Sequence, residues 1–162
     1  MVTAADMLWM AETIYMYIPA YLANAAPVLC GGGKPLDGGR KWRGLPLLGS
    51  HKTVRGTLSG IVVGTAVGLM QLEPVKGFLM GVGAVSGDLI VSSVKRRLGL
   101  RSGSPFPVAD QLGFIVAALA LASLVPPRPT WERVVAIIVA TVPIHLITNI
   151  FAWLLKLKRN PW

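Results

Sequence analysis

The chain has 162 residues, of which 53% are hydrophobic and only 14% are charged, and its formal net charge is +9. Long apolar runs in a chain of this composition indicate a multi-span membrane protein and leave no segment for a soluble domain. The single cysteine, Cys30, excludes an internal disulfide.

Five segments are long enough to cross a bilayer, at about residues 8–29, 55–73, 75–95, 107–126 and 131–155. We do not expect the first to be a cleaved signal peptide, because it lacks basic residues at its start and carries Asp6 and Glu12 instead. We therefore predict an all-α integral membrane protein, with one membrane-embedded domain over residues 1–162 and five transmembrane helices.

The basic residues are distributed unevenly around these segments. Thirteen fall between the first and second segments, after the third, or at the end of the chain: Lys34, Arg40, Lys41, Arg43, Lys52, Arg55, Lys95, Arg96, Arg97, Arg101, Lys156, Lys158 and Arg159. Three fall on the other side: Lys76, Arg128 and Arg133. The positive-inside rule predicts an N-terminus outside, with two long loops and the C-terminus in the cytoplasm. Most of the positive charge is thus explained by topology rather than by nucleic-acid binding. The remaining basic residues are available to bind anionic ligands at the cytoplasmic surface.

The first cytoplasmic loop, residues 31–56, is rich in glycine and basic residues. Glycines such as Gly33 and Gly49 permit the backbone angles that turn N–H groups toward an anion. The loop ends in Ser50-His51-Lys52-Thr53-Val54-Arg55-Gly56, which starts the second helix with hydroxyl and cationic groups, a favourable place for phosphate. The spacing is not that of a Walker A loop. A flexible, positively charged loop that merely fixes topology is the alternative interpretation.

Asp88 lies inside the third apolar segment, where a carboxylate is costly and therefore indicates a functional site. On a helix, Ser92, Lys95 and Arg96 follow it at i+4, i+7 and i+8, which places all four residues on one face. That face suits a metal ion and a phosphate. The alternative is an internal ion pair between Asp88 and a basic residue.

Asp110 opens the fourth segment at the cytoplasmic border. Because a single loop joins the third and fourth segments, we expect their helices to be antiparallel neighbours, with Asp88 and Asp110 converging. Two such carboxylates can hold a divalent cation that keeps open positions for phosphates. The alternative for Asp110 is a helix N-terminal charge favoured by the macrodipole.

The fifth segment carries a polar stripe of Thr141, His145, Thr148 and Asn149. We favour an interhelical packing role for His145, and interpret Asn24 in the first segment similarly. Three tryptophans are predicted to be interfacial anchors: Trp9, Trp131 and Trp153.

Two motifs resemble the signature of the CTP-dependent phosphatidate cytidylyltransferase superfamily: Gly87-Asp88-Leu89 followed by Lys95-Arg96, and the Ser50–Gly56 segment. The chain is most similar to the archaeal branch, the CDP-archaeol synthases. That similarity also rests on Pro19-Ala20-Tyr21 with Asn24, Gly32-Gly33 with Pro35, Asp37 and Gly39, Asp110-Gln111-Leu112, His145 with Asn149, and Pro161-Trp162. Gly113 stands where many relatives carry a further Asp, which puts the full metal coordination shell in question.

The resemblance implies transfer of CMP from CTP to 2,3-di-O-geranylgeranylglyceryl phosphate, with release of pyrophosphate. It implies a multi-pass protein of the cell membrane whose site faces the cytoplasm and whose cofactor is Mg²⁺. Asp88 and Asp110 would hold the metal, and the catalytic residues would be Asp88, Asp110, Lys52 and Lys95. Nucleotide binding would fall to Gly33, Asp37, Gly49, Lys52, Thr53, Arg55, Ser92 and Arg96, with Lys95 and Arg96 on either the pyrophosphate or the lipid phosphate. The partners are CTP, an isoprenoid glycerol-phosphate lipid and the bilayer, with no nucleic acid; the oligomeric state is left open.

Two alternatives remain. A CTP-dependent polyprenol kinase would use similar groups but transfer the γ-phosphoryl group and release CDP. A small membrane transporter would also accommodate an intramembrane Asp and His. However, the sequence has no inverted repeat, and a transporter does not explain a 26-residue glycine- and lysine-rich loop.

Overall fold

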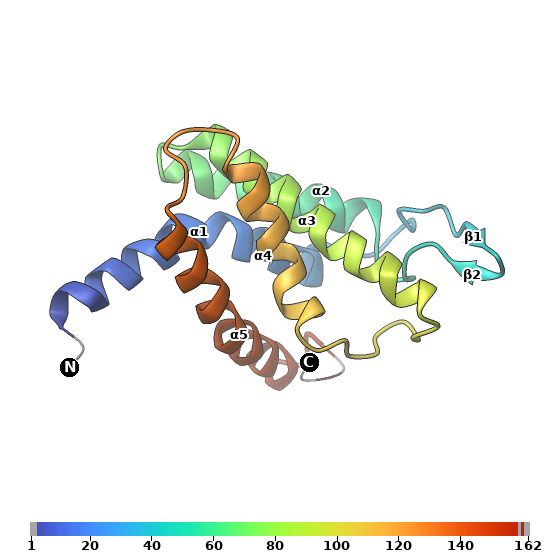
Figure 1. Cartoon of the computed structure of the whole chain (residues 1–162). Coiled ribbons are helices and arrows are strands. Elements are labelled where there is room, and N and C mark those ends of the chain that lie inside the picture. Colours follow the sequence, from blue (N-terminus) through green and yellow to red (C-terminus); the bar gives the residue numbers. More distant parts are fainter. Residues whose placement is uncertain (1–2, 159, 161–162) are drawn as a thin grey trace.

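The computed structural model describes residues 3–158 and residue 160; Arg159 and the Pro161-Trp162 motif lie outside the described residues. Within that part of the chain there are five helices: α1 (Ala4–Cys30), α2 (Val54–Met70), α3 (Pro74–Arg97), α4 (Ala109–Ala122) and α5 (Trp131–Leu154) (Figure 1). Each predicted segment coincides with one helix, which confirms the all-helical fold class. The first long loop adds a small antiparallel hairpin of β1 (Lys41–Trp42) and β2 (Leu45–Pro46), which the sequence did not indicate.

Threonines begin three of the helices. Thr3 forms a capping box with Asp6 at the start of α1. The hydroxyl oxygens of Thr53 and Thr130 accept the N–H groups of Gly56 and Arg133, at 3.1 and 3.4 Å. These bonds satisfy backbone donors that the first turn of a helix leaves unpaired, so the helix starts are specified locally.

Glycines set how closely α2, α3 and α4 approach. A Cβ atom added at Gly64 of α2 would lie 2.7 Å from Gly81 Cα of α3. On another face of α3, a Cβ at Gly83 would lie 2.6 Å from Ala118 Cα of α4. Glycines on two faces of α3 therefore allow it to approach both α2 and α4 closely.

The apolar core lies where α1, α3, α4 and α5 meet. Tyr17, Met80, Phe114, Ile115 and Ile137 are buried there. In contrast, many large apolar side chains point outward, among them Val62, Leu69, Ile90, Val116, Val139 and Leu146. An outward apolar surface of this extent suits a lipid environment better than water.

Among the described residues, α3 and α5 are long and apolar enough to cross a membrane, whereas α2 and α4 are apolar but shorter. The predicted fourth segment, residues 107–126, is longer than α4 because it includes turns at both of its ends. At 1.5 Å per residue, the 14 residues of α4 span about 21 Å, less than the ~30 Å of a bilayer core.

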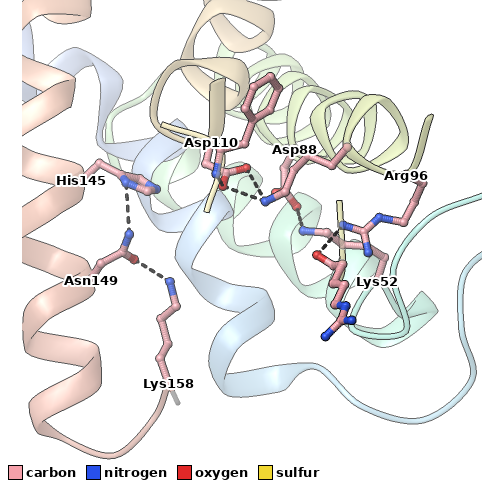
Figure 2. Close-up of polar contacts among 10 residues, drawn as sticks. Lys52, Asp88, Arg96, Asp110, His145, Asn149 and Lys158 are labelled. Atoms are coloured by element: carbon pink, nitrogen blue, oxygen red, sulfur yellow. Dashed lines mark hydrogen bonds and ion pairs between the residues drawn. The ribbon is translucent and has the colours of Figure 1, made fainter. Parts of the chain in front are cut away.

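The helices run up and down, so their connections gather at two ends of the molecule. In Figure 1 the β1–β2 hairpin, the α3–α4 loop and the C-terminal end of α5 lie toward one end. The short α2–α3 and α4–α5 connections lie toward the other. Asp88 and Asp110 belong to the first end, together with the two long loops (Figure 2).

Candidate active site

Two lysine–carboxylate pairs form the centre of the candidate site (Figure 2). Lys52, which precedes α2, pairs with Asp88 of α3. Lys95 of α3 pairs with Asp110 of α4, its Nζ lying 2.7 and 3.0 Å from the two carboxylate oxygens. The structure therefore brings together the four residues predicted to be catalytic. The ion pair considered as an alternative for Asp88 is present, with Lys52 as its partner.

A close contact between α3 and α4 places the two carboxylates. A Cβ added at Gly87 would collide with the carbonyl oxygen of Gly113, so these helices touch through backbone at this level. Asp88 follows Gly87 directly, and Asp110 lies one turn before Gly113. Lys95, two turns beyond Asp88, can therefore reach across to Asp110. This contact agrees with the prediction that the third and fourth helices are antiparallel neighbours.

Asp110 is fixed by the turn that starts α4. Its carboxylate accepts the N–H of Phe106 at 2.8 Å. Val108 has φ 66° and ψ −55°, and the N–H of Ala109 donates to the Pro107 carbonyl at 2.7 Å. This is the geometry of a γ-turn, which is strained for a β-branched residue. Asp110 is therefore a first-turn helix charge, the alternative considered for it, and is also half of an ion pair. Its metal-binding role stays a prediction.

Lys52 is held by a hydrogen-bonded loop rather than by a flexible one. Its carbonyl accepts the N–H of Leu36 at 2.8 Å, and its N–H donates to the Gly49 carbonyl at 2.9 Å. An isolated bridge pairs Pro35 with Thr53. The two ends of the loop therefore lie side by side, and the Lys52 backbone is fixed before α2 begins.

Asp37 organises the same loop. Its carboxylate accepts the N–H groups of Gly39 at 2.9 Å and of Leu48 at 3.0 Å. Near the end of the loop, Gly49 lies against the α3–α4 loop: a Cβ there would be 2.9 Å from Ser102 Oγ. The predicted nucleotide contacts of Asp37 and Gly49 stay predictions, and their present role is to shape the loop that carries Lys52.

Arg96 is turned toward the α3–α4 loop. Its side chain is buried and donates to the Arg101 carbonyl at 2.9 Å, and its Nε has no hydrogen-bond partner among the described residues. Two other residues predicted to bind nucleotide, Ser92 and Arg55, are less buried than Arg96. Ser92 is half-buried one turn beyond Asp88, and Arg55 is exposed in the first turn of α2, with its Cδ 3.8 Å from a Cβ placed at Gly33.

Two cavities adjoin the pairs. One, of about 40 Å³, is lined by residues that include Asn24, Lys52, Thr53 and Asp88, which brings the predicted motif residue Asn24 to the site. This volume holds a water molecule but no nucleotide. The other is an apolar groove of about 630 Å³ between α3 and α4, lined by residues that include Gly87, Ile90, Phe106, Leu112 and Val116.

The sequence assigned Lys158 to topology alone, but the structure places it beside this site. Its Nζ donates to Asn149 Oδ1 at 2.9 Å, and Asn149 Nδ2 lies 3.1 Å from His145 Nδ1. The His145 ring stacks on Phe114 of α4 with centroids 6.0 Å apart, in keeping with its predicted packing role. Burial lowers the pKa of Lys158 below the ordinary lysine value, and the Asp110 carboxylate opposes that shift.

Comparison with known proteins decides the family. The model of the CarS-like family, described as CDP-archaeol synthase, matches residues 5–76 and 73–162. This chain belongs to the CDP-archaeol synthase family. The CDP-archaeol synthase of Methanopyrus kandleri is 44% identical over 163 residues, covering 94% of each chain. That of Pyrococcus abyssi is 42% identical over 164 residues, covering 93% of this chain and 97% of the relative.

A solved structure supports the fold of the CDP-archaeol synthase family for this chain. It is described as an intramembrane enzyme for archaeal membrane lipids biosynthesis, and it is 38% identical to this chain. The two structures agree with a TM-score of 0.81, covering 87% of this chain and 94% of the other. The family resemblance predicted from the sequence motifs is confirmed.

Proposed function

We propose that this chain is a membrane-embedded CTP-dependent cytidylyltransferase that transfers CMP to an isoprenoid glycerol-phosphate lipid and releases pyrophosphate. Membership of the CDP-archaeol synthase family supports this activity. The structural observation that carries the proposal is the grouping of two lysine–carboxylate pairs beside an apolar groove. The lysines of the pairs suit the phosphates of both substrates, and the groove suits the tails of the lipid. The reaction joins a nucleotide phosphate to a lipid phosphate, so it needs both features side by side.

In this reaction an oxygen of the lipid phosphate attacks the α-phosphorus of CTP. The bond from that phosphorus to the bridging oxygen breaks, and pyrophosphate leaves with the electron pair. Two polyanions must approach, so the site has to supply positive charge. Lys52 and Lys95 supply it: each ammonium neutralises a carboxylate before substrate binds and is placed to turn toward phosphate oxygens when it arrives.

The donor set fits Mg²⁺. The described residues contain no group of three or more His, Cys, Asp or Glu side chains placed to hold a metal, and Mg²⁺ commonly takes one or two carboxylates together with waters and substrate phosphates. Asp88 and Asp110 would be those carboxylates. When bound, the ion would neutralise and orient the triphosphate. The lysines that now occupy both carboxylates would then be released to bind phosphate.

The apolar groove between α3 and α4 is proposed to receive the isoprenoid tails. Its lining runs from Phe106, whose N–H donates to Asp110, along α3 and α4 to Ala120. A lipid lying there would have its phosphate near the ion pairs and its tails against apolar side chains. Binding a soluble nucleotide and a lipid at one site requires this adjacency.

We further propose that all five helices cross the membrane, with the N-terminus outside and the site open to the cytoplasm. The asymmetry of basic residues supports this orientation. The short α4 is compatible with it, because α4 packs closely on the longer α3 and is continued by loop residues at both ends. Cysteine accessibility from each side of sealed vesicles would test the orientation.

The function is tested with purified full-length protein in detergent, α-³²P-CTP, Mg²⁺ and a geranylgeranylated glycerol phosphate. We expect label in the lipid extract, and we expect that label to be lost when EDTA is added and in the Asp88→Asn variant. Label from γ-³²P-CTP instead would mean a lipid kinase. Label from neither nucleotide in the lipid extract would reject cytidylyl transfer and leave the transporter.

A further inference from the structure

The chain reverses direction after α5. The N–H of Leu157 donates to the Ala152 carbonyl, and that of Lys156 to the Trp153 carbonyl, both at 2.9 Å. Lys156 has φ 59°. These are the two bonds and the left-handed residue of a Schellman helix end, with lysine where glycine is usual. The reversal returns the chain to the polar face of α5, so Lys158 lies beside Asn149, nine residues earlier.

The hydrogen bonds of this segment fix the order of its polar groups (Figure 2). A lysine ammonium only donates, so the Asn149 oxygen faces Lys158 and the Asn149 nitrogen faces His145. His145 Nδ1 must then accept, which leaves the ring proton on Nε2. The stacked Phe114 holds the ring from α4. Lys158 is thus positioned by a chain of contacts that ends on the helix carrying Asp110.

This chain of contacts points Lys158 toward the ion pairs. Phe114 lies at i+4 from Asp110, so both occupy one face of α4. The charges of Asp110, Lys52, Asp88 and Lys95 all act on Lys158, which places its ammonium within electrostatic reach of both pairs. An ammonium group in this position is a suitable donor to phosphate oxygens of a substrate bound at the pairs.

We propose that Lys158 is a third lysine of the active site, which binds phosphate oxygens of a substrate held between the two ion pairs. This rests on the proposed function, and the phosphate belongs either to the triphosphate of CTP or to the lipid phosphate. Asn149 and His145 act through Lys158 and are positioning residues. The segment from Lys156 to Lys158 is thereby part of the site rather than a topological signal alone.

The experiment measures the Kd of CTP and the Kd of the ether-lipid phosphate for full-length protein in detergent. Lys158→Gln is compared with Lys156→Gln, which removes the same charge from an exposed side chain of the same turn. Lys158→Arg keeps the charge. Because charge-assisted hydrogen bonds to phosphate are strong, we expect about a tenfold or greater rise in one Kd for Lys158→Gln, little change for Lys156→Gln and substantial recovery in Lys158→Arg. If Lys158→Gln does not fold, Lys158→Met replaces it.

The ligand whose Kd rises identifies the source of the phosphate. Both Kd values within about twofold of the wild type would overturn the proposal. Asn149→Leu should raise the same Kd less, and should add little in the double variant with Lys158→Gln, because both act through one group; a fully additive double variant would remove Asn149 from its positioning role. Binding is read without turnover, so a failure of cytidylyl transfer in the wild type is distinguishable from a failure of this inference.

Discussion

Gly87 of α3 and Gly113 of α4 meet backbone to backbone, and Asp88 and Asp110 lie within one turn of that contact. Because neither position has a side chain, the helices come closer than packed side chains would allow. The separation of Asp88 and Asp110 is therefore set by two glycines. Gly113 stands where many relatives were expected to carry Asp, and a Cβ there would collide with Val91 Cγ2, so a larger residue would require α3 and α4 to adjust.

Gly87→Ala should separate α3 from α4. Its methyl group would meet the Gly113 carbonyl, and overpacking of this kind costs ~1–3 kcal/mol. We expect a lower thermal midpoint in detergent and a loss of cytidylyl transfer larger than the loss of folded protein explains. Val94→Ala, an exposed position on the same helix, is the control and should change little. An unchanged midpoint for Gly87→Ala would show that the helices are not held at this contact.

Replacing either carboxylate by its amide should remove activity without unfolding the protein. Asp88→Asn and Asp110→Asn each keep the side-chain shape but lose the charge that we assign to metal binding. We expect cytidylyl transfer to fall ~100-fold or more, and stability to change by no more than about 1 kcal/mol, because both ion pairs are partly exposed. Glu132→Gln at the other end of the molecule should be fully active. Near-normal turnover in either Asn variant would remove that carboxylate from the metal site.

The sequence predicted the helices well because their signals are local and strong. Apolar runs bounded by glycine, proline and capping threonines fix where α1 to α5 lie. The single loop between α3 and α4 correctly predicted that these helices are neighbours. The exact ends were less predictable. Residues 107 and 108 were predicted to belong to the fourth helix, but they form the turn that positions Asp110. The reason is that a proline followed by a residue at positive φ does not continue a helix.

The sequence singled out residues that the structure brings together, but it did not indicate their contacts. Asp88 was conspicuous as a carboxylate in an apolar helix, yet nothing in the periodicity indicated Lys52 as its partner, because that pairing depends on how an irregular loop folds. Lys158 was missed for a related reason. The chain reverses at Lys156 without the glycine that usually marks such a reversal, so the return of Lys158 to Asn149 was not predictable from the sequence.

Asp37→Ala should loosen the first loop and weaken nucleotide binding indirectly. The substitution leaves the N–H groups of Gly39 and Leu48 without their acceptor, which costs ~1–3 kcal/mol where such groups are buried and less where they are exposed. We expect faster hydrogen exchange at both amides and a higher KM for CTP, with kcat much less affected. Asp37→Asn keeps one acceptor oxygen, so its hydrogen exchange and its KM for CTP should lie between those of the wild type and Asp37→Ala. A loss of kcat with unchanged hydrogen exchange would instead indicate that Asp37 contacts the reacting groups.

The alkaline limb of the pH profile should report Lys158. Burial lowers the pKa of this lysine, so it loses its proton at lower pH than an exposed lysine, and kcat/KM, which follows the free enzyme, should fall as pH rises through that lowered value. The free energy of unfolding should rise in the same window, because the unfolded chain then binds more protons than the folded one. Arginine stays protonated, so Lys158→Arg should move the limb to higher pH, whereas Lys156→Gln should leave it in place. An identical limb in wild type and Lys158→Arg would assign the titration to another group.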